Sequence, residues 1–115
     1  YMTDYNERFL ASEIIREKVF EFYGEEIPYS TTVEIEEFKE REAGKDFIKA
    51  IIYVERESQK GIIIGKDGKA IKHVGLVARE EIEKEIGRKV YLELLVKVIE
   101  KWRKDKSKLY KLGYK

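Results

Sequence analysis

The residues best suited to binding chemistry lie in one short stretch, Gln59-Lys60-Gly61-Ile62-Ile63-Ile64-Gly65-Lys66-Asp67-Gly68-Lys69-Ala70-Ile71. Three consecutive isoleucines need a hydrophobic core. The turn that follows, Gly65 to Gly68, is instead open and cationic. Glycines at its two ends allow another backbone to approach closely, and the N-terminus of a following helix adds positive partial charge. The stretch therefore predicts a site for a chain of phosphates beside an apolar surface.

A single-stranded nucleic acid presents phosphates on one side and unstacked bases on the other, which matches such a surface. We expect the turn to hold the backbone through Gly65, Lys66, Asp67 and Gly68. We expect a groove for the bases, formed by Ile63, Ile64, Ile71 and edge residues of the second strand. Supporting positive charge is expected from Lys60, Lys69 and Lys72. The isoleucines are equally compatible with a place in the core.

Other chemistry lacks the residues that it needs. The segment Gly61–Asp67 is a poor phosphate-binding P-loop, because three residues separate its glycines where four are required and Asp67 replaces the Ser or Thr that holds magnesium. The chain has no cysteine, and its single histidine, His73, cannot build a metal site or a catalytic triad alone. We therefore predict no catalytic residue, no metal site and no cofactor for these residues.

Composition indicates one folded domain. The chain has 115 residues, 43% hydrophobic and 41% charged, with one proline, which suits a single core and argues against disorder. Its apolar runs are only a few residues long, so no transmembrane segment and no signal peptide is predicted, and a cytoplasmic location is expected.

The net charge of +1 conceals an uneven distribution. Residues 1–57 contain 8 Lys and Arg against 15 Asp and Glu, a net of −7, whereas residues 58–115 contain 16 against 8, a net of +8. Such a division predicts that the second half faces an anionic partner. Chance clustering of surface charge is the alternative.

The pattern of apolar residues predicts the elements that position the stretch. We expect helices over residues 7–23, 59–64 (capped by Ser58) and 69–86, and strands over 31–41, 47–55 and 89–99. A bulge near Glu36-Glu37 would restore the alternation of the first strand, and the second strand, apolar on both faces, should be central. A basic helix is expected over residues 101–112.

This order of elements defines the fold class. A tight turn makes the first two strands antiparallel, and a helix–helix crossover makes the second and third parallel. The prediction is an α+β fold: a mixed three-stranded sheet with helices packed on one face.

The segment from about Thr31 to Ile99 resembles a type II KH domain, of order α-β-β-α-α-β, whose defining feature is a GxxG loop, here at residues 65–68. Residues 8–18, 26–30 and 58–66, and the ending around Trp102-Arg103-Lys104-Asp105 and Leu112-Gly113-Tyr114, resemble the C-terminal region of the Era family of bacterial GTPases. The resemblance implies a first helix and N-terminal segment over 1–30, a KH core over 31–99, and a basic C-terminal helix and tail over 100–115.

The resemblance also implies a function. Family members bind the 3′ end of small-subunit ribosomal RNA during assembly of the small ribosomal subunit. The implied partners are single-stranded RNA, the small subunit and the GTPase domain of a full-length chain, and no DNA is expected. The GTPase domain is missing from this sequence, so no enzyme activity is expected here, and GTP and magnesium would bind only to that absent domain.

Two alternatives stay open. The KH fold could be degenerate and serve as a protein-docking or ribosomal structural module, although an intact GxxG loop with flanking lysines argues against this. Residues 97–115 carry a net charge of +6. They could extend the RNA path, lie peripherally on the inner membrane face with Trp102 and Tyr110 as anchors, or form a capping helix with a solvated basic face.

Overall fold

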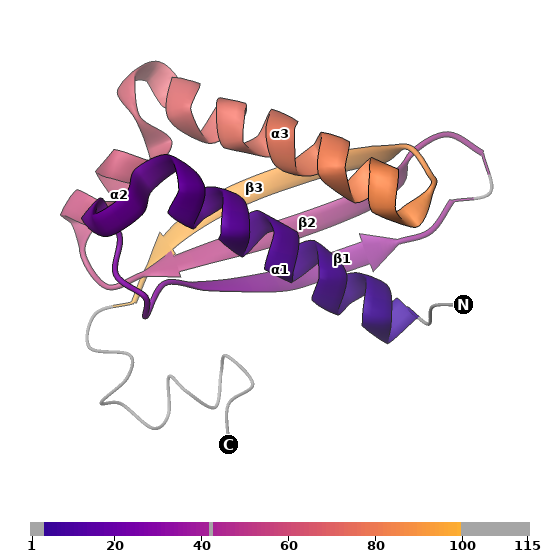
Figure 1. Cartoon of the computed structure of the whole chain (residues 1–115), viewed down its shortest axis with the longest axis horizontal. Helices are drawn as coiled ribbons and strands as arrows, with labels where there is room; N and C mark the ends of the chain where they lie inside the picture. Colours follow the sequence, from indigo (N-terminus) through magenta and orange to yellow (C-terminus); the bar gives the residue numbers. More distant parts are fainter. Residues whose placement is uncertain (1–3, 42, 100–115) are drawn as a thin grey trace.

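Three helices cover one face of a three-stranded sheet in the computed structural model, which describes residues 4–41 and 43–99 (Figure 1). The elements in chain order are α1 (Asp4–Tyr23), β1 (Thr32–Lys39), β2 (Asp46–Val54), α2 (Glu57–Ile64), α3 (Lys69–Ile86) and β3 (Val90–Val98). Single turns of 3-10 helix follow α1 (Gly24–Glu26) and precede α3 (Lys66–Gly68). The sheet order is β1-β2-β3, with β1 antiparallel and β3 parallel to β2. The predicted α+β fold with a mixed sheet is confirmed.

Most predicted boundaries agree with the structure within one or two residues. The helix α3 spans the predicted residues 69–86, and Gly87, which ends it, adopts a left-handed conformation with φ of 75°. Two details differ. The helix α1 begins at Asp4, earlier than predicted. Ser58 lies inside α2 and does not cap it; the Gln59 side chain instead accepts hydrogen bonds from the backbone amides of Glu55 and Arg56. The helix predicted over residues 101–112 lies outside the described residues.

The central position of β2 follows from its composition. Ile48, Ala50 and Ile52 are fully buried in the core beneath the helices, and Ile51, on the opposite face of the strand, is also fully buried. The strand β1 shifts register between Ile35 and Glu37, which confirms the predicted bulge. A strand that is apolar on both faces is most stable between two neighbours.

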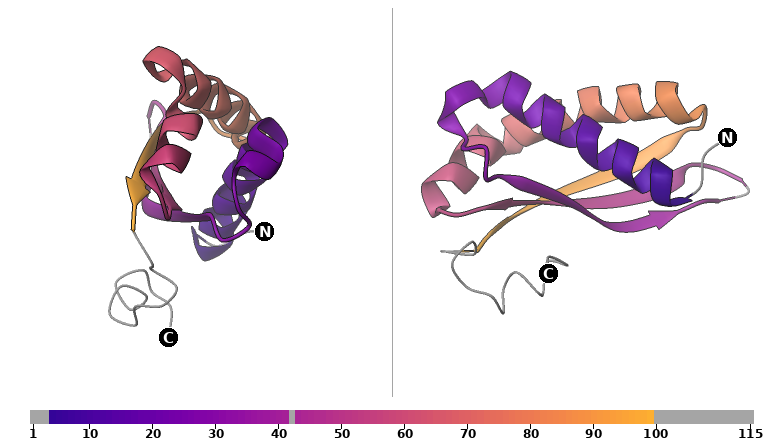
Figure 2. Two further views of the ribbon diagram at one scale, coloured as in Figure 1. Left: turned by 90° about the vertical axis from the view of Figure 1, so that its left-hand side faces the viewer. Right: turned by 60° about the horizontal axis from the view of Figure 1, so that its bottom comes forward.

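The core lies between this sheet and the helices α1 and α3, which lie side by side over it (Figure 2). Apolar residues at helical spacing form the buried stripe of each helix. They are Ala11, Ile14, Ile15, Val19 and Tyr23 in α1, and Val74, Ala78 and Ile82 in α3. The two helices are also joined by an ion pair, since Lys18 Nζ lies 2.8 Å from Glu81 Oε1 and the Lys18 side chain is only 10% exposed.

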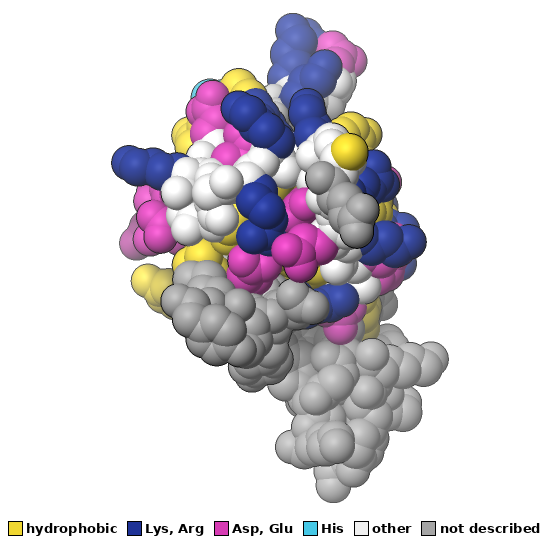
Figure 3. Space-filling model, turned by 90° about the vertical axis from the view of Figure 1, so that its right-hand side faces the viewer, with side chains coloured by type: hydrophobic (Ala, Val, Ile, Leu, Met, Phe, Trp, Pro, Cys, Tyr) yellow, Lys and Arg dark blue, Asp and Glu magenta, His cyan; other side chains and the backbone are white. Residues whose placement is uncertain are grey.

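An ion cluster ties α1 and β2 to the turn after α3. The Arg88 guanidinium donates to both carboxylate oxygens of Glu7, at 2.8 and 3.2 Å, and to Asp46 Oδ2 at 2.7 Å. Asp46 is almost fully buried. These carboxylates raise the pKa of Arg88 further above its ordinary value, so its charge is permanent. The cluster lies at the end of the molecule that carries the N-terminus of α1, where acidic and basic side chains intersperse (Figure 3).

Candidate nucleic-acid interface

The loop Gly65–Gly68 joins α2 to α3 through a conformation that requires glycine at its first position. Gly65 has φ of 75° and ψ of 177°, a region that is accessible almost only to glycine. A Cβ atom there would also lie 2.5 Å from the Cβ of Ala70. Both the backbone angles and the close approach of Ala70 therefore exclude a side chain at Gly65.

The second half of the loop is left-handed and open. Asp67 has φ of 56° and Gly68 has φ of 73°. Aspartate is among the few non-glycine residues that tolerate this conformation. A Cβ added to Gly68 would meet no atom within 4 Å, and no side chain caps the N-terminus of α3 at Gly68. The loop thus leaves open space beside Gly68 at the N-terminus of α3, a suitable arrangement for a phosphate.

The charged residues around this loop are accessible. Lys66, Asp67 and Lys69 are exposed. Lys72, one turn along α3, is exposed as well, and Lys60 on α2 is half-buried. The structure therefore brings the predicted cations together at one end of the molecule, the end opposite the Arg88 cluster (Figure 1).

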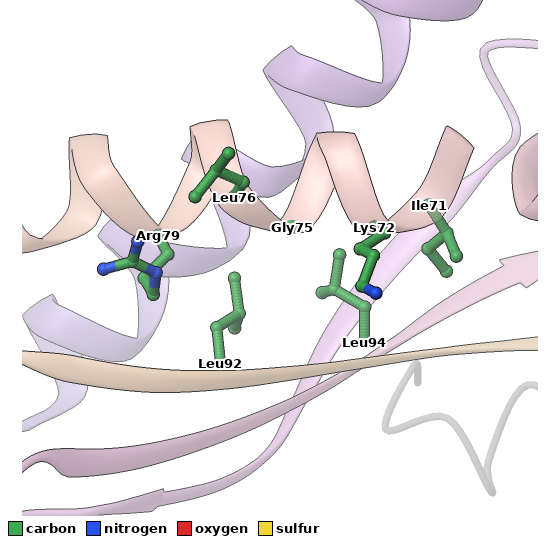
Figure 4. A pocket seen from close by; sticks show the side chains of 7 residues that line it. All are labelled: Ile71, Lys72, Gly75, Leu76, Arg79, Leu92 and Leu94. Atoms are coloured by element: carbon green, nitrogen blue, oxygen red, sulfur yellow. The ribbon is translucent and has the colours of Figure 1, made fainter. Parts of the chain in front are cut away.

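A groove with apolar and basic lining residues lies between α3 and β3 and begins at Ile71, one turn after this loop (Figure 4). Its volume is about 250 Å³. In Figure 4, Ile71 and Lys72 reach from α3 toward β3, whereas Leu92 and Leu94 reach from β3 toward the helix. The complete lining is Ile71, Lys72, Gly75, Leu76, Arg79, Leu92 and Leu94.

The structure corrects two expectations for the groove. Ile63 is fully buried in the core, so its side chain has no surface to offer a base. Edge residues of the second strand cannot form a wall, because β2 is central and has no free edge. The wall is the edge strand β3. Of the other predicted groove residues, Ile71 lines the groove, and Ile64 is half-buried and packs against the core.

Sequence reasoning missed five lining residues: Gly75, Leu76, Arg79, Leu92 and Leu94. One signal was available, because a glycine inside a helix costs about 1 kcal/mol relative to alanine and usually has a packing or functional reason. Here a Cβ at Gly75 would lie 3.5 Å from Leu94 Cδ1, so the glycine keeps the groove floor open. The sequence predicted a strand over residues 89–99, which contains Leu92 and Leu94, but did not show that this strand lies at an edge of the sheet.

Arg79 occupies the end of the groove away from the loop and is held by Glu83. The Arg79 guanidinium donates to Glu83 Oε1 at 3.0 Å, and Glu83 Oε2 accepts from the amide of Val90 at 2.7 Å. Burial of Glu83 opposes its ionisation, but the Val90 amide and Arg79 outweigh burial and hold the pKa of the carboxyl below its ordinary value. Glu83 therefore links the C-terminal half of α3 to the start of β3.

Residues 4–41 and 43–99 contain neither a cluster of metal-ligating side chains nor a membrane-spanning helix. No group of three or more His, Cys, Asp or Glu side chains among them could hold a metal ion. His73 is exposed and makes an edge-on ring contact with Phe22. None of the helices in these ranges is both long and apolar enough to cross a bilayer.

An α+β fold with a GxxG loop at the end of an apolar groove defines a class of nucleic-acid-binding module. The KH domain family matches residues 26–103 of this sequence, and the chain belongs to that family. Comparison with curated relatives shows which KH-containing proteins the chain resembles. The chain is 56% identical to the GTPase Era of Thermotoga maritima over 115 residues and 55% identical to that of Geobacter metallireducens over 114 residues. The predicted resemblance to Era is confirmed.

These matches cover 99% and 98% of this chain but 38% of each relative. The chain therefore spans little more than a third of the length of the proteins that it matches. It corresponds to their KH region and not to their GTPase domain, so this chain is not itself a GTPase.

Solved structures show the same fold. A variant of Aquifex aeolicus Era bound to GDP and AlF4⁻ is 46% identical and superimposes with a TM-score of 0.81, covering 93% of this chain and 36% of that one. A second structure, Era in complex with MgGDPNP and nucleotides 1506–1542 of 16S ribosomal RNA, is also 46% identical, with a TM-score of 0.82 and the same coverage.

Proposed function

We propose that this chain binds single-stranded RNA, with the phosphate backbone on the Gly65–Gly68 loop and the bases in the groove between α3 and β3. The observation that carries the proposal is the closeness of a cationic loop to a groove that begins one turn further along α3 and is lined by Ile71, Leu92 and Leu94 beside basic side chains. Lys66 and Lys69 flank the loop, and Lys72 lines the groove. Phosphates and splayed bases would thus each meet a complementary surface.

We propose the 3′ end of small-subunit ribosomal RNA as the ligand, in the assembly of the small ribosomal subunit in the cytoplasm. The support is the similarity to Era, including the relative solved with nucleotides 1506–1542 of 16S ribosomal RNA. In that setting, an upstream GTPase domain and the small subunit would be the partners, with GTP and magnesium belonging to the GTPase domain.

The alternatives have less support. A degenerate KH fold used only for protein docking would not need the positive-φ backbone of Gly65 and Gly68 or the open space beside Gly68. The membrane alternative depends on residues 100–115, outside the described ranges, and none of the comparisons supports it.

The test is the Lys66→Asp variant, with binding of a small-subunit 3′-end oligonucleotide measured by fluorescence anisotropy. Loss of one charge-assisted phosphate contact costs about 1.5–3 kcal/mol, so we expect affinity to fall by about 10- to 100-fold. The matched control is Lys45→Asp, the same charge change at an exposed residue of the β1–β2 hairpin. Unchanged affinity in a folded Lys66→Asp variant would contradict the role of the loop.

Two further measurements complete the test: a salt titration, and a comparison of RNA with DNA of the same sequence. Each phosphate contact should contribute about −0.7 to the slope of log affinity against log salt for a single strand. The slope should therefore be shallower in Lys66→Asp than in Lys45→Asp. A DNA strand of the same sequence should bind more weakly than the RNA.

A further inference from the structure

An exposed aromatic pair lies on the side of α3 that the groove does not use. The ring of Phe22, near the end of α1, contacts the imidazole of His73 on α3 edge to face, with ring centroids 4.8 Å apart. Phe22 is 43% exposed and Leu76 is 47% exposed, although both belong to residue types that are usually buried. Neither belongs to the buried core or to the partly buried residues packed against it.

A second hollow opens beside this pair, lined by Lys69, Lys72, His73 and Leu76. Its lining residues are spaced i, i+3, i+4 and i+7, so they form one stripe along the first two turns of α3. Lys72 and Leu76 also line the groove. The two hollows therefore meet along one ridge of α3, directly after the Gly65–Gly68 loop.

The chemistry of this ridge suits a nucleotide better than a protein. Lysine is depleted in the centres of protein–protein interfaces, yet two lysines line this hollow. In contrast, cations beside exposed aromatic rings are typical of sites for single-stranded nucleic acid, where bases stack on Phe or His and phosphates meet Lys. Continuity with the groove places the next nucleotide of the same strand within reach of the ridge.

We propose that Phe22, His73 and Leu76 form a stacking platform for the base of a nucleotide that flanks the groove-bound RNA, with Lys69 and Lys72 beside its phosphates. This inference rests on the proposed RNA binding in the groove and extends the site across α3. It adds a residue of α1, Phe22, which lies outside the region 26–103 matched by the KH domain family.

The test compares RNAs of different length. A KH groove with a GxxG loop holds about four nucleotides. We would measure the affinity of a four-nucleotide RNA from the small-subunit 3′ end, and of the same RNA extended by one and two nucleotides at either end. Stacking of a base on an aromatic ring contributes about 1–3 kcal/mol, so extension at one end should raise affinity by about 5- to 100-fold.

The variants Phe22→Ala and His73→Ala should lose this gain while binding the four-nucleotide RNA like the wild type. His73→Phe should keep the gain, because a phenyl ring also stacks. Phe9→Ala is the matched control, since Phe9 is an exposed aromatic residue near the other end of α1, 59% exposed. Thermal melting of each variant verifies that it is folded. With 2-aminopurine as the flanking base, fluorescence should be quenched on binding to the wild type and less quenched with His73→Ala.

Two results would overturn the platform. One is an extension gain that persists in both Phe22→Ala and His73→Ala, and the other is no gain at either end of the RNA for the wild type. In both cases, the four-nucleotide RNA gives a separate result: whether the wild type still binds it and loses affinity for it on Lys66→Asp substitution. That loss would support the proposed RNA binding in the groove independently of the platform. If the wild type binds none of these RNAs, both proposals fall together.

Discussion

The hydroxyl of Tyr23 donates a hydrogen bond of 2.6 Å to the backbone carbonyl of Ile63, joining the last residue of α1 to the last turn of α2. Both residues are buried. The last four carbonyls of a helix lack partners within the helix, so this bond satisfies an acceptor that would otherwise be buried alone. Because Gly65 follows two residues later, α1 helps to position the GxxG loop.

Substitution Tyr23→Phe should therefore destabilise the fold. It leaves the Ile63 carbonyl buried without this donor, and we expect the free energy of unfolding to fall by about 1–3 kcal/mol in urea denaturation. Amide exchange at Ile64 and Gly65 should also accelerate. The control is Tyr29→Phe, since Tyr29 is 86% exposed. Equal stabilities of the two variants would show that the Tyr23 bond contributes nothing.

Gly75 allows stability and binding to be separated. Gly75→Leu should fill the groove floor and abolish binding of the four-nucleotide RNA, with the circular dichroism of the wild type retained. Gly75→Ala places a Cβ in ordinary contact with Leu94, so it should fold and gain up to about 1 kcal/mol from helix propensity. Gly61→Ala is the matched control in α2, where a Cβ meets no atom within 4 Å. Wild-type RNA affinity for Gly75→Leu would exclude the groove as the base site.

The Arg88 cluster should carry much of the stability at the opposite end. Arg88→Ala leaves Glu7 and the buried Asp46 without their cation. Removing one partner of a buried pair costs about 3–5 kcal/mol, and because the Arg88 side chain is 32% exposed, solvent should reduce this to about 2–4 kcal/mol. Chemical denaturation measures the loss, with Lys45→Ala as an exposed control. A loss below 1 kcal/mol would mean that water replaces the guanidinium.

Ionisation of Glu83 should make the folding stability depend on pH. Its pKa is lowered in the folded protein from an ordinary value of 4.5, so its ionised form stabilises the fold above pH 4.5. That contribution is lost as the pH falls through the lower, folded-state value. The stability difference between wild type and Glu83→Gln should hence be largest above pH 4.5 and shrink below it. Thermal melting between pH 3 and 7 measures this, with Glu85→Gln, an exposed residue of α3, as control. A difference that does not vary with pH would contradict the role of ionised Glu83.

Local patterns determined much of the structure. The periodicity of apolar residues predicted α3, β3 and the central strand β2. This periodicity follows from backbone geometry and can be seen in consecutive residues. The bulge before Glu37 and the glycine loop at residues 65–68 could also be predicted, because each depends on a few neighbouring residues. The KH and Era resemblance rested on contiguous segments, which the relatives confirm.

Only the tertiary structure decided which surfaces are free. Ile63 and Ile64 are adjacent and chemically identical, yet packing buries the first completely and leaves the second half-buried. The groove wall belongs to β3 because the sheet order places that strand at an edge. Arg88 finds Glu7 across 81 positions of sequence. Such contacts depend on how whole helices and strands pack against one another. Short-range patterns of residue types do not predict that packing.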